Sequence, residues 1–363
     1  MKNSRVIRRI IALSIILVLT PVVTFGADAL LEYEFEMINA LQEEDGSVLL
    51  VGRTGLPANY DGVVMKLDAE GRLLWQMNEA SMGSDLYSGI VSCQNNQYIA
   101  LHIDTSIPDM AYLEKVDSGK VTCVYQVDNE QSFNIFPAKD GFLLLTGTSF
   151  TSTSLTYFDL NLQPVWRRTF DYGYRFNEVL TLADCYVGIG YYYPDNQSCA
   201  RSLLCKISHD NSSIEVFSPY ENAIFTDASF VNGNIYIVGD TDPLEGWRES
   251  FFVSYNSEDG FIRNDYSYGS NREGNFYSLI PDDNGFVVAC SVSKSEGNIH
   301  WINFDCQGNG VRASSTQCNT IRIVNRALLF RQKDRIFAVV CGISQTGNLV
   351  YKTEVLQLTN KCE

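Results

Sequence analysis

A pattern that recurs seven times constrains the fold of this 363-residue chain more than any other feature. In each copy a small polar residue opens an apolar run, and a turn and a second apolar run follow. The seven polar positions lie about 43 to 51 residues apart: Asn39, Ser88, Asn134, Asn177, Asp227, Ser278 and Asn325. A repeat of this length is one supersecondary unit, which buries its apolar surface only by packing against neighbouring copies.

Each copy reads as four short strands separated by turns. In the clearest copy, apolar runs cover residues 48–53, 62–67 and 72–76, and Asp-Gly and Asp-Ala-Glu-Gly segments supply the turns. The second run ends near a small residue in most copies, and the seven positions are Gly52, His102, Gly147, Gly190, Gly239, Cys290 and Cys341. No apolar 3.6-residue period occurs beyond the N-terminal segment, which argues against helical repeats. The sequence therefore predicts an all-β fold, a seven-bladed β-propeller with four antiparallel strands in each blade.

The two ends of the chain are expected to complete one blade together. The last copy has strand-like runs near 325–331, 336–342 and 350–358, and no fourth run follows. Residues 30–35, LLEYEF, resemble the fourth runs of other copies, such as LLWQMN. We predict that this N-terminal strand completes the last blade, because the pairing would remove an open sheet edge.

The N-terminal segment has the parts of a signal peptide. Its basic residues are Lys2, Arg5, Arg8 and Arg9. An apolar run at 10–19 follows, and small residues allow cleavage after Gly26 or Ala29. The alternative is an uncleaved anchor helix, for which the apolar run is short. We therefore expect a signal peptide at 1–29 and one propeller domain at 30–363. The mature protein should be a monomer, secreted or at the cell surface, without membrane association after cleavage.

Charge and cysteine content limit the partners and the cross-links. Acidic residues outnumber basic ones by 43 to 27, and the net charge is −16. Polyanions would be repelled, so no nucleic acid partner is expected, whereas basic peptides, proteins and neutral glycans are compatible. Ten cysteines leave disulfide pairing open in an exported chain. We expect Cys205, Cys290 and Cys341, which lie in apolar strands, to be buried. Any disulfide should come from the other cysteines.

The first copy also carries a family resemblance. Its segments DGSVLLVGRTG and DGVVMKLDAEGRLLW are similar to repeats of exported bacterial β-propellers, which read roughly D-G-G-hydrophobic-V-G-x-T and K-L-D-x-x-G-x-x-x-W. The run LDAEGRLLWQ also resembles quinoprotein-like and WD-like propeller repeats. The resemblance implies a propeller but no cofactor. Quinoprotein dehydrogenases commonly carry adjacent cysteines beside the quinone, and this chain has no Cys-Cys pair.

Residues that commonly carry catalysis are sparse in this chain. The histidines lie in different copies and form no metal-binding pattern: His102, His209 and His300. No G-x-S-x-G elbow and no sialidase-type S-x-D-x-G-x-x-W turn occurs. Carboxylates such as Asp104, Asp227 and Glu249 would suit a glycosidase if they met in the channel. We predict no catalytic residue and no metal site.

Two groups of residues are candidates for ligand binding. The first strands of a propeller line its channel, so the seven polar positions should form a ring near one channel mouth. Alternatively, these side chains bond nearby backbone N–H groups. The second group lies in aromatic loops of the fourth and fifth copies, at Tyr172, Tyr174, Arg175, Tyr191, Tyr192, Tyr193, Trp247 and Arg248. Such side chains suit sugars or peptide side chains, and packing between blades is the alternative.

These observations favour a binding or interaction module for a peptide, a glycan or a partner protein. The first alternative is a carbohydrate-active or redox enzyme with its site at the channel mouth. The second alternative is a structural surface protein with no small-molecule site.

Overall fold

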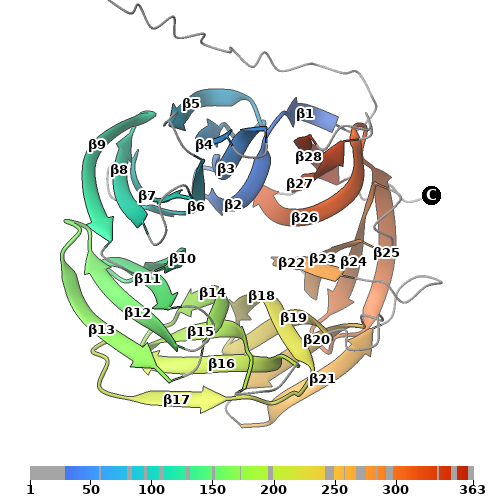
Figure 1. The fold of residues 1–363 in the computed structure, drawn as a ribbon. Helices are drawn as coiled ribbons and strands as arrows, with labels where there is room; N and C mark the ends of the chain where they lie inside the picture. Colours follow the sequence, from blue (N-terminus) through green and yellow to red (C-terminus); the bar gives the residue numbers. More distant parts are fainter. Residues whose placement is uncertain are drawn as a thin grey trace, which may run out of the picture.

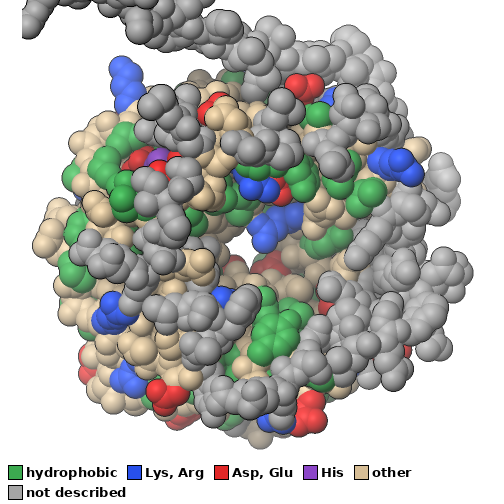
Figure 2. All heavy atoms as spheres, viewed as in Figure 1, with side chains coloured by type: hydrophobic (Ala, Val, Ile, Leu, Met, Phe, Trp, Pro, Cys, Tyr) green, Lys and Arg blue, Asp and Glu red, His purple; other side chains and the backbone are tan. Residues whose placement is uncertain are grey.

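The computed structural model is a ring of seven four-stranded antiparallel sheets (Figure 1). The predicted all-β, seven-bladed propeller is confirmed. The structure describes residues 29–56, 59–79, 84–93, 96–105, 110–127, 131–148, 152–171, 173–194, 199–241, 249–256, 258–266, 275–282, 285–291, 297–332, 335–344 and 350–358. Side chains leave the centre of the ring open (Figure 2). In these residues, no helix is long and apolar enough to cross a membrane.

Each blade runs from an inner strand beside the central opening to an outer strand at the rim (Figure 1). Blade 1 contains β2 (Glu36–Gln42), β3 (Val48–Leu56), β4 (Asn59–Leu67) and β5 (Leu73–Glu79). Blade 2 contains β6 (Asp85–Ser92), β7 (Gln97–Asp104), β8 (Met110–Asp117) and β9 (Lys120–Val127). Blade 3 contains β10 (Gln131–Ala138), β11 (Gly141–Thr148), β12 (Ser152–Asp159) and β13 (Pro164–Phe170). Blade 4 contains β14 (Arg175–Thr181), β15 (Cys185–Tyr192), β16 (Arg201–Ser208) and β17 (Ile214–Phe217). Blade 5 contains β18 (Ala223–Val231), β19 (Asn234–Thr241), β20 (Ser250–Asn256) and β21 (Gly260–Tyr266). Blade 6 is β22 (Asn275–Asp282), β23 (Gly285–Ser291), β24 (Asn298–Asp305) and β25 (Gly310–Gln317). Blade 7 contains β26 (Ile321–Gln332), β27 (Arg335–Ser344) and β28 (Tyr351–Leu358).

The N-terminal strand completes the seventh blade, as predicted. β1 (Ala29–Tyr33) pairs antiparallel with β28, and Tyr33 lies opposite Thr353. The order of strands in this sheet is β1-β28-β27-β26. Tyr33 and Phe35 are 3% and 1% exposed, and both pack into a core that blades 7 and 1 share. The chain therefore closes the ring with a strand from its opposite end.

A β-bulge interrupts the inner strand of every blade at the same place. In blade 1, the pairing of β2 with β3 shifts between Met37 and Asn39, which leaves Ile38 as the extra residue. The extra residues of blades 2 to 7 are Ser88, Phe133, Asn177, Thr226, Tyr277 and Asn325. A bulge takes one residue out of the ladder and re-aims the neighbouring side chains. The same distortion therefore recurs seven times in the inner strands.

The recurring glycine of the second strand lies opposite the residue that precedes the bulge. A Cβ atom on Gly52 would overlap the carbonyl oxygen of Glu36. The equivalent overlap with a first-strand carbonyl arises at three other glycines, Gly190, Gly239 and Gly342. The glycine of the repeat therefore permits a close approach of two backbones.

Strand pairing corrects two positions of the repeat. In blade 7 the glycine position belongs to Gly342, which pairs with Val324, and not to Cys341. In blade 3 it belongs to Thr146 rather than to Gly147. The turns between first and second strands differ in length among the copies, so counting along the chain does not give the register.

Replacing Gly52 by alanine should test this close approach. The new methyl group must push β2 away from β3, and overpacking of this kind costs about 1–3 kcal/mol. Urea denaturation should show a lower midpoint for Gly52→Ala than for the native protein. The exposed substitution Lys120→Ala on β9 serves as the control and should leave the midpoint unchanged. An unchanged midpoint for Gly52→Ala would contradict the steric explanation.

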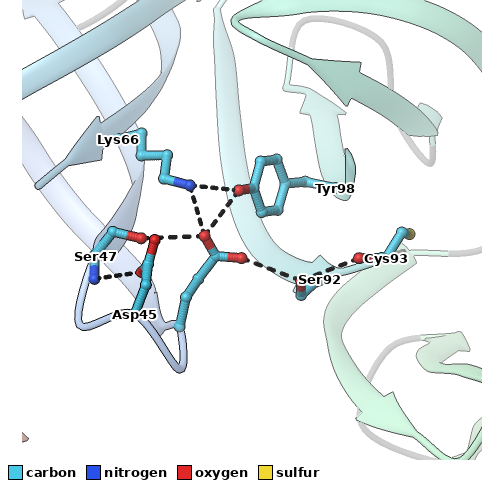
Figure 3. A network of polar contacts seen from close by, with 7 residues as sticks. Asp45, Ser47, Lys66, Ser92, Cys93 and Tyr98 are labelled. Carbon is cyan, nitrogen blue, oxygen red and sulfur yellow. Dashed lines mark hydrogen bonds and ion pairs between the residues drawn. The ribbon is translucent and has the colours of Figure 1, made fainter. Parts of the chain in front are cut away.

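A polar network joins blades 1 and 2. Lys66 on β4 donates to Glu43 Oε2 at 2.6 Å and to the hydroxyl of Tyr98 on β7 at 2.7 Å (Figure 3). Ser92 donates to Glu43 Oε1 at 3.2 Å. Burial opposes both charges, but the hydrogen bonds and mutual attraction raise the pKa of Lys66 and lower the pKa of Glu43. The lysine of this third strand therefore links two blades.

Three cysteines of the described chain are buried thiols. Cys205 and Cys341 are 0% and 1% exposed, as predicted, and burial raises their pKa values to about 12 and about 11. Cys318, which follows β25, is also 1% exposed, although the sequence placed it among the candidates for a disulfide. Because the thiolate is the reactive form, all three are unreactive at neutral pH. The side chain of Cys290 lies outside the described part.

Candidate functional site in the central channel

The inner strands enclose a cavity of about 620 Å³ in the central channel. Six of the seven polar positions singled out in the sequence line it: Asn39, Ser88, Asn134, Asn177, Asp227 and Asn325. The seventh, Ser278, is 4% exposed, and its Oγ accepts a hydrogen bond from the Leu329 N–H at 3.2 Å.

These seven residues do not occupy one structural position. Four of them follow the bulge directly: Asn39, Asn134, Asp227 and Ser278. The other three, Ser88, Asn177 and Asn325, are the extra residues of their bulges. In their blades the equivalent positions belong to Gly89, Glu178 and Arg326. The repeat pattern missed two charged residues because it selected the polar residue one place earlier.

Side chains that follow the bulge accept hydrogen bonds from backbone N–H groups next to the bulge. Asn39 Oδ1 accepts from the Ala40 N–H at 2.8 Å, and Asp227 Oδ1 accepts from the Ala228 N–H at 2.8 Å. Asn39 also donates through Nδ2 to Asn134 Oδ1 at 3.2 Å, across blade 2. This contact needs Gly89, since a Cβ atom there would lie 2.6 Å from Asn134 Oδ1. The side-chain amides of Asn39 and Asn134 are therefore already hydrogen-bonded within the protein.

Blades 4 and 5 contribute three carboxylates to the wall, from Glu178, Asp227 and Asp240. Asp240 is 4% exposed and accepts a hydrogen bond from Ser250, whereas Glu178 and Asp227 act on each other. Burial raises the pKa of Glu178, and the negative charge of Asp227 raises it further. Burial also raises the pKa of Asp227, although N–H donors, including Leu279 N at 2.7 Å from Oδ2, partly oppose the shift. Within the described chain, no lysine or arginine forms an ion pair with Glu178 or Asp227.

Blade 7 contributes the guanidinium of Arg326 to the same cavity. Burial lowers the pKa of Arg326, and the charges of Cys341 and Glu36 act in the opposite direction. Glu36 is itself paired with Arg53 at 2.6 Å. No carboxylate of the described residues lies within ion-pair distance of Arg326. Figure 2 shows basic and acidic side chains within the central opening.

The aromatic candidates of blade 4 divide into two groups. Arg175 and Tyr191 pair across β14 and β15, and both line the cavity. Tyr174 is 7% exposed and packs in the core, where its ring lies 5.3 Å from that of Tyr192. The ring of Tyr193 meets that of Tyr191 at 5.8 Å, edge to face. The other three candidates, Tyr172, Trp247 and Arg248, lie outside the described residues.

Two further carboxylates considered for an enzyme do not line this cavity. Asp104 ends β7 and pairs with Met110, and Glu249 is exposed beside Thr241, whose hydroxyl accepts the Glu249 N–H at 2.8 Å. Of the three carboxylates singled out in the sequence, only Asp227 contributes to the channel wall.

Comparison with known proteins identifies the fold alone. No family model and no curated protein matches the chain. The RRP9 WD40 repeats superpose with a TM-score of 0.57 at 10% identity, over 89% of this chain and 95% of theirs. The U3-55K structure gives 0.58 at 10%, over 90% and 96%. The propeller domain of the Trilobed protease from Pyrococcus furiosus, described as having an open velcro topology, gives 0.55 at 10%, over 90% and 96%. This chain is therefore a seven-bladed propeller with WD40-like structural neighbours.

Proposed function

We propose that this propeller is a binding module that receives a cationic group of a peptide or partner protein in its central channel. The observation that carries the proposal is the pair of Glu178 and Asp227 on one wall of the cavity. Burial raises the pKa of Glu178 to about 8 and that of Asp227 to about 6, so ionising both carboxyl groups in the folded protein costs free energy. A cation between them would offset that cost. Arg175 lines the same cavity, but no lysine or arginine of the described chain forms an ion pair with either carboxylate.

Other residues of the cavity wall are also of the types that are common in binding sites. Arg175 and Tyr191 line the same cavity, and tyrosine and arginine dominate interaction hot spots. The WD40-like structural neighbours support a role in recognition by analogy of fold alone. Export of the protein stays a prediction from the N-terminal segment, because residues 1–28 lie outside the described residues.

The test measures by calorimetry the binding of two amino acid derivatives whose α-amino and α-carboxyl groups are blocked as uncharged amides. N-acetyl-lysinamide carries a single ammonium group, and N-acetyl-norleucinamide lacks it. We expect binding of the lysine probe alone, weakened at least about 10-fold by Glu178→Gln or Asp227→Asn. The exposed substitution Glu258→Gln is the matched control and should leave binding unchanged. If the native protein binds neither probe, the proposal fails.

The pH dependence has a defined sign. A cation needs ionised carboxylates, so affinity should rise between about pH 5 and about pH 9, while the lysine ammonium stays charged. For the free protein, a raised carboxyl pKa means that the folded state binds more protons, so stability falls as pH rises through this window. Glu178→Gln should therefore make the free protein more stable than the native one at the alkaline end. Binding and stability thus respond in opposite directions, which thermal denaturation and calorimetry can detect together.

A glycoside hydrolase is the second candidate. Asp227 accepts more hydrogen bonds than Glu178, so it loses its proton more readily, and such a division suits an acid and a charge-stabilising partner. Release of nitrophenol from aryl glycosides, abolished by Glu178→Gln, would favour the enzyme. No release with intact binding of the lysine probe would favour the binding module.

A further inference from the structure

Acidic and basic side chains line different parts of the channel cavity. The inference drawn from this arrangement rests on the proposed cation site and extends it. Glu178 and Asp227 lie on blades 4 and 5, and Arg326 lies on blade 7. Arg175, on the same strand as Glu178, also lines the cavity. In Figure 1 the inner strand β26 faces β14 across the central opening, and β22 lies between β26 and β18. The side chains of Glu178, Asp227 and Arg326 line the same cavity of about 620 Å³. A ligand with one positive group would neutralise one wall and leave the other charged.

Arg326 needs an anion as much as the carboxylates need a cation. Arg326 lines the cavity with an exposed side chain, and no carboxylate of the described residues lies within ion-pair distance of it. Glu36, the carboxylate whose charge acts on Arg326, is already paired with Arg53. A guanidinium presents parallel N–H donors that match the two oxygens of a carboxylate.

We propose that the channel binds a molecule whose ammonium and carboxylate groups lie at opposite ends of a short chain, such as a lysine with a free carboxyl group. A cavity of about 620 Å³, taken as a sphere, is about 11 Å across. An α-amino acid without a charged side chain holds its two charges too close together to reach both walls. The four-carbon stem of lysine separates the ammonium from the carboxylate and spans this space. The ammonium lies against Glu178 and Asp227, and the carboxylate binds Arg326.

The ligand chemistry can come from two sources, a free lysine or the C-terminal lysine of a peptide. The remaining carboxylate of the wall, Asp240, is 4% exposed and already accepts hydrogen bonds from Ser250 and the Phe276 N–H. The amides of Asn39 and Asn134 are also bonded, so this part of the wall is a poor partner for a free α-ammonium group. The C-terminal lysine is therefore the form that the cavity favours. N-acetyl-lysine represents it, because its α-nitrogen is an uncharged amide.

The decisive comparison is between N-acetyl-lysine and N-acetyl-lysinamide, which differ only in the carboxylate. We expect the acid to bind at least about 10-fold more tightly than the amide. Arg326→Met should remove this difference and leave the affinity for the amide unchanged. Arg335→Met, at the exposed start of β27, is the control and should preserve the difference. Thermal denaturation of both variants checks that the fold is retained.

Further probes define the spacing and the source. 6-Aminohexanoate should compete with N-acetyl-lysine, whereas glycine and hexanoate should not. Tighter binding of free lysine than of N-acetyl-lysine would overturn the preference for a peptide C-terminus. Equal binding of the acid and the amide, with no effect of Arg326→Met, would overturn the bipolar site and leave the cation site intact. Binding of neither probe would overturn both proposals.

Discussion

Replacing His102 by alanine should lower the free energy of unfolding by about 3–5 kcal/mol, because it leaves two buried carboxylates without their cation. The Nδ1 atom of His102 lies 2.9 Å from Glu114 Oε1, and Nε2 lies 3.2 Å from Asp85 Oδ1. Asp85 is 0% and Glu114 4% exposed, so water cannot replace the imidazolium. Tyr87 donates to Glu114 Oε2 at 2.6 Å and would remain after the substitution. One hydroxyl cannot compensate for the lost charge.

The same cluster predicts how stability depends on pH. Burial lowers the pKa of His102, but the hydrogen bonds and charges of Glu114 and Asp85 outweigh it, and the net shift is upward. A raised pKa means that the folded state binds the proton more tightly than the unfolded state. The stabilisation is therefore complete below the unfolded pKa of about 6.5 and is lost as pH rises through the folded value. In His102→Ala this part of the pH dependence should be absent.

Urea denaturation at several pH values measures both effects. His209→Ala is the matched control, since no carboxylate of the described chain lies within ion-pair distance of that imidazole. The double variant His102→Ala/Glu114→Ala should lose less stability than the sum of the single variants, because the uncompensated charge is removed with its partner. A loss below about 1 kcal/mol, or strict additivity, would show that the cluster is not the ion pair described.

The blade count and the closure were predictable because every copy displays them separately. The Asp45-Gly46 turn and the apolar runs that follow it recur with only moderate variation in spacing, so one poorly preserved copy does not obscure the others. The N-terminal run 30–35 was recognisable because the last copy lacks a fourth strand. Both inferences depend on patterns that are local in sequence, and the strand pairing of the structure confirms them.

The channel site was less predictable, because it depends on register. A bulge shifts strand pairing without any characteristic residue, so Asn177 and Asn325 stood out where Glu178 and Arg326 hold the equivalent positions. A search for small polar residues also passes over charged ones. Only the pairing of each first strand with its second strand reveals which side chains share one level of the channel.

The alternation of side chains along a strand explains why two neighbouring aromatic candidates lie in different environments. Tyr191 and Tyr192 are consecutive residues of β15, so their side chains point to opposite faces of the sheet. Tyr191 lines the channel beside its partner Arg175, and Tyr192 packs against the core. The sequence assigned both residues to a loop. Extending the strand by two residues would have predicted that only one of them lines the cavity.

Removing β1 should have a still larger effect than the loss of His102. A chain that begins at Glu36 lacks Tyr33 and Phe35, and truncation of each such buried aromatic side chain costs about 3–5 kcal/mol. It also lacks the hydrogen bond that Thr353 Oγ1 donates to the Phe35 carbonyl at 2.9 Å. The combined loss is comparable with the whole stability of an ordinary domain, about 5–15 kcal/mol.

The shortened chain should therefore unfold at a much lower temperature or associate through the exposed edge of β28. A chain that begins at residue 29 keeps β1 and should melt like the full-length protein. A synthetic peptide of residues 29–35, added in trans, should restore the melting temperature of the shortened chain by pairing with β28. Thermal denaturation and size-exclusion chromatography distinguish these outcomes. If the chain from Glu36 stays monomeric with an unchanged melting temperature, the ring is stable while open, and closure by β1 is not what holds blades 7 and 1 together.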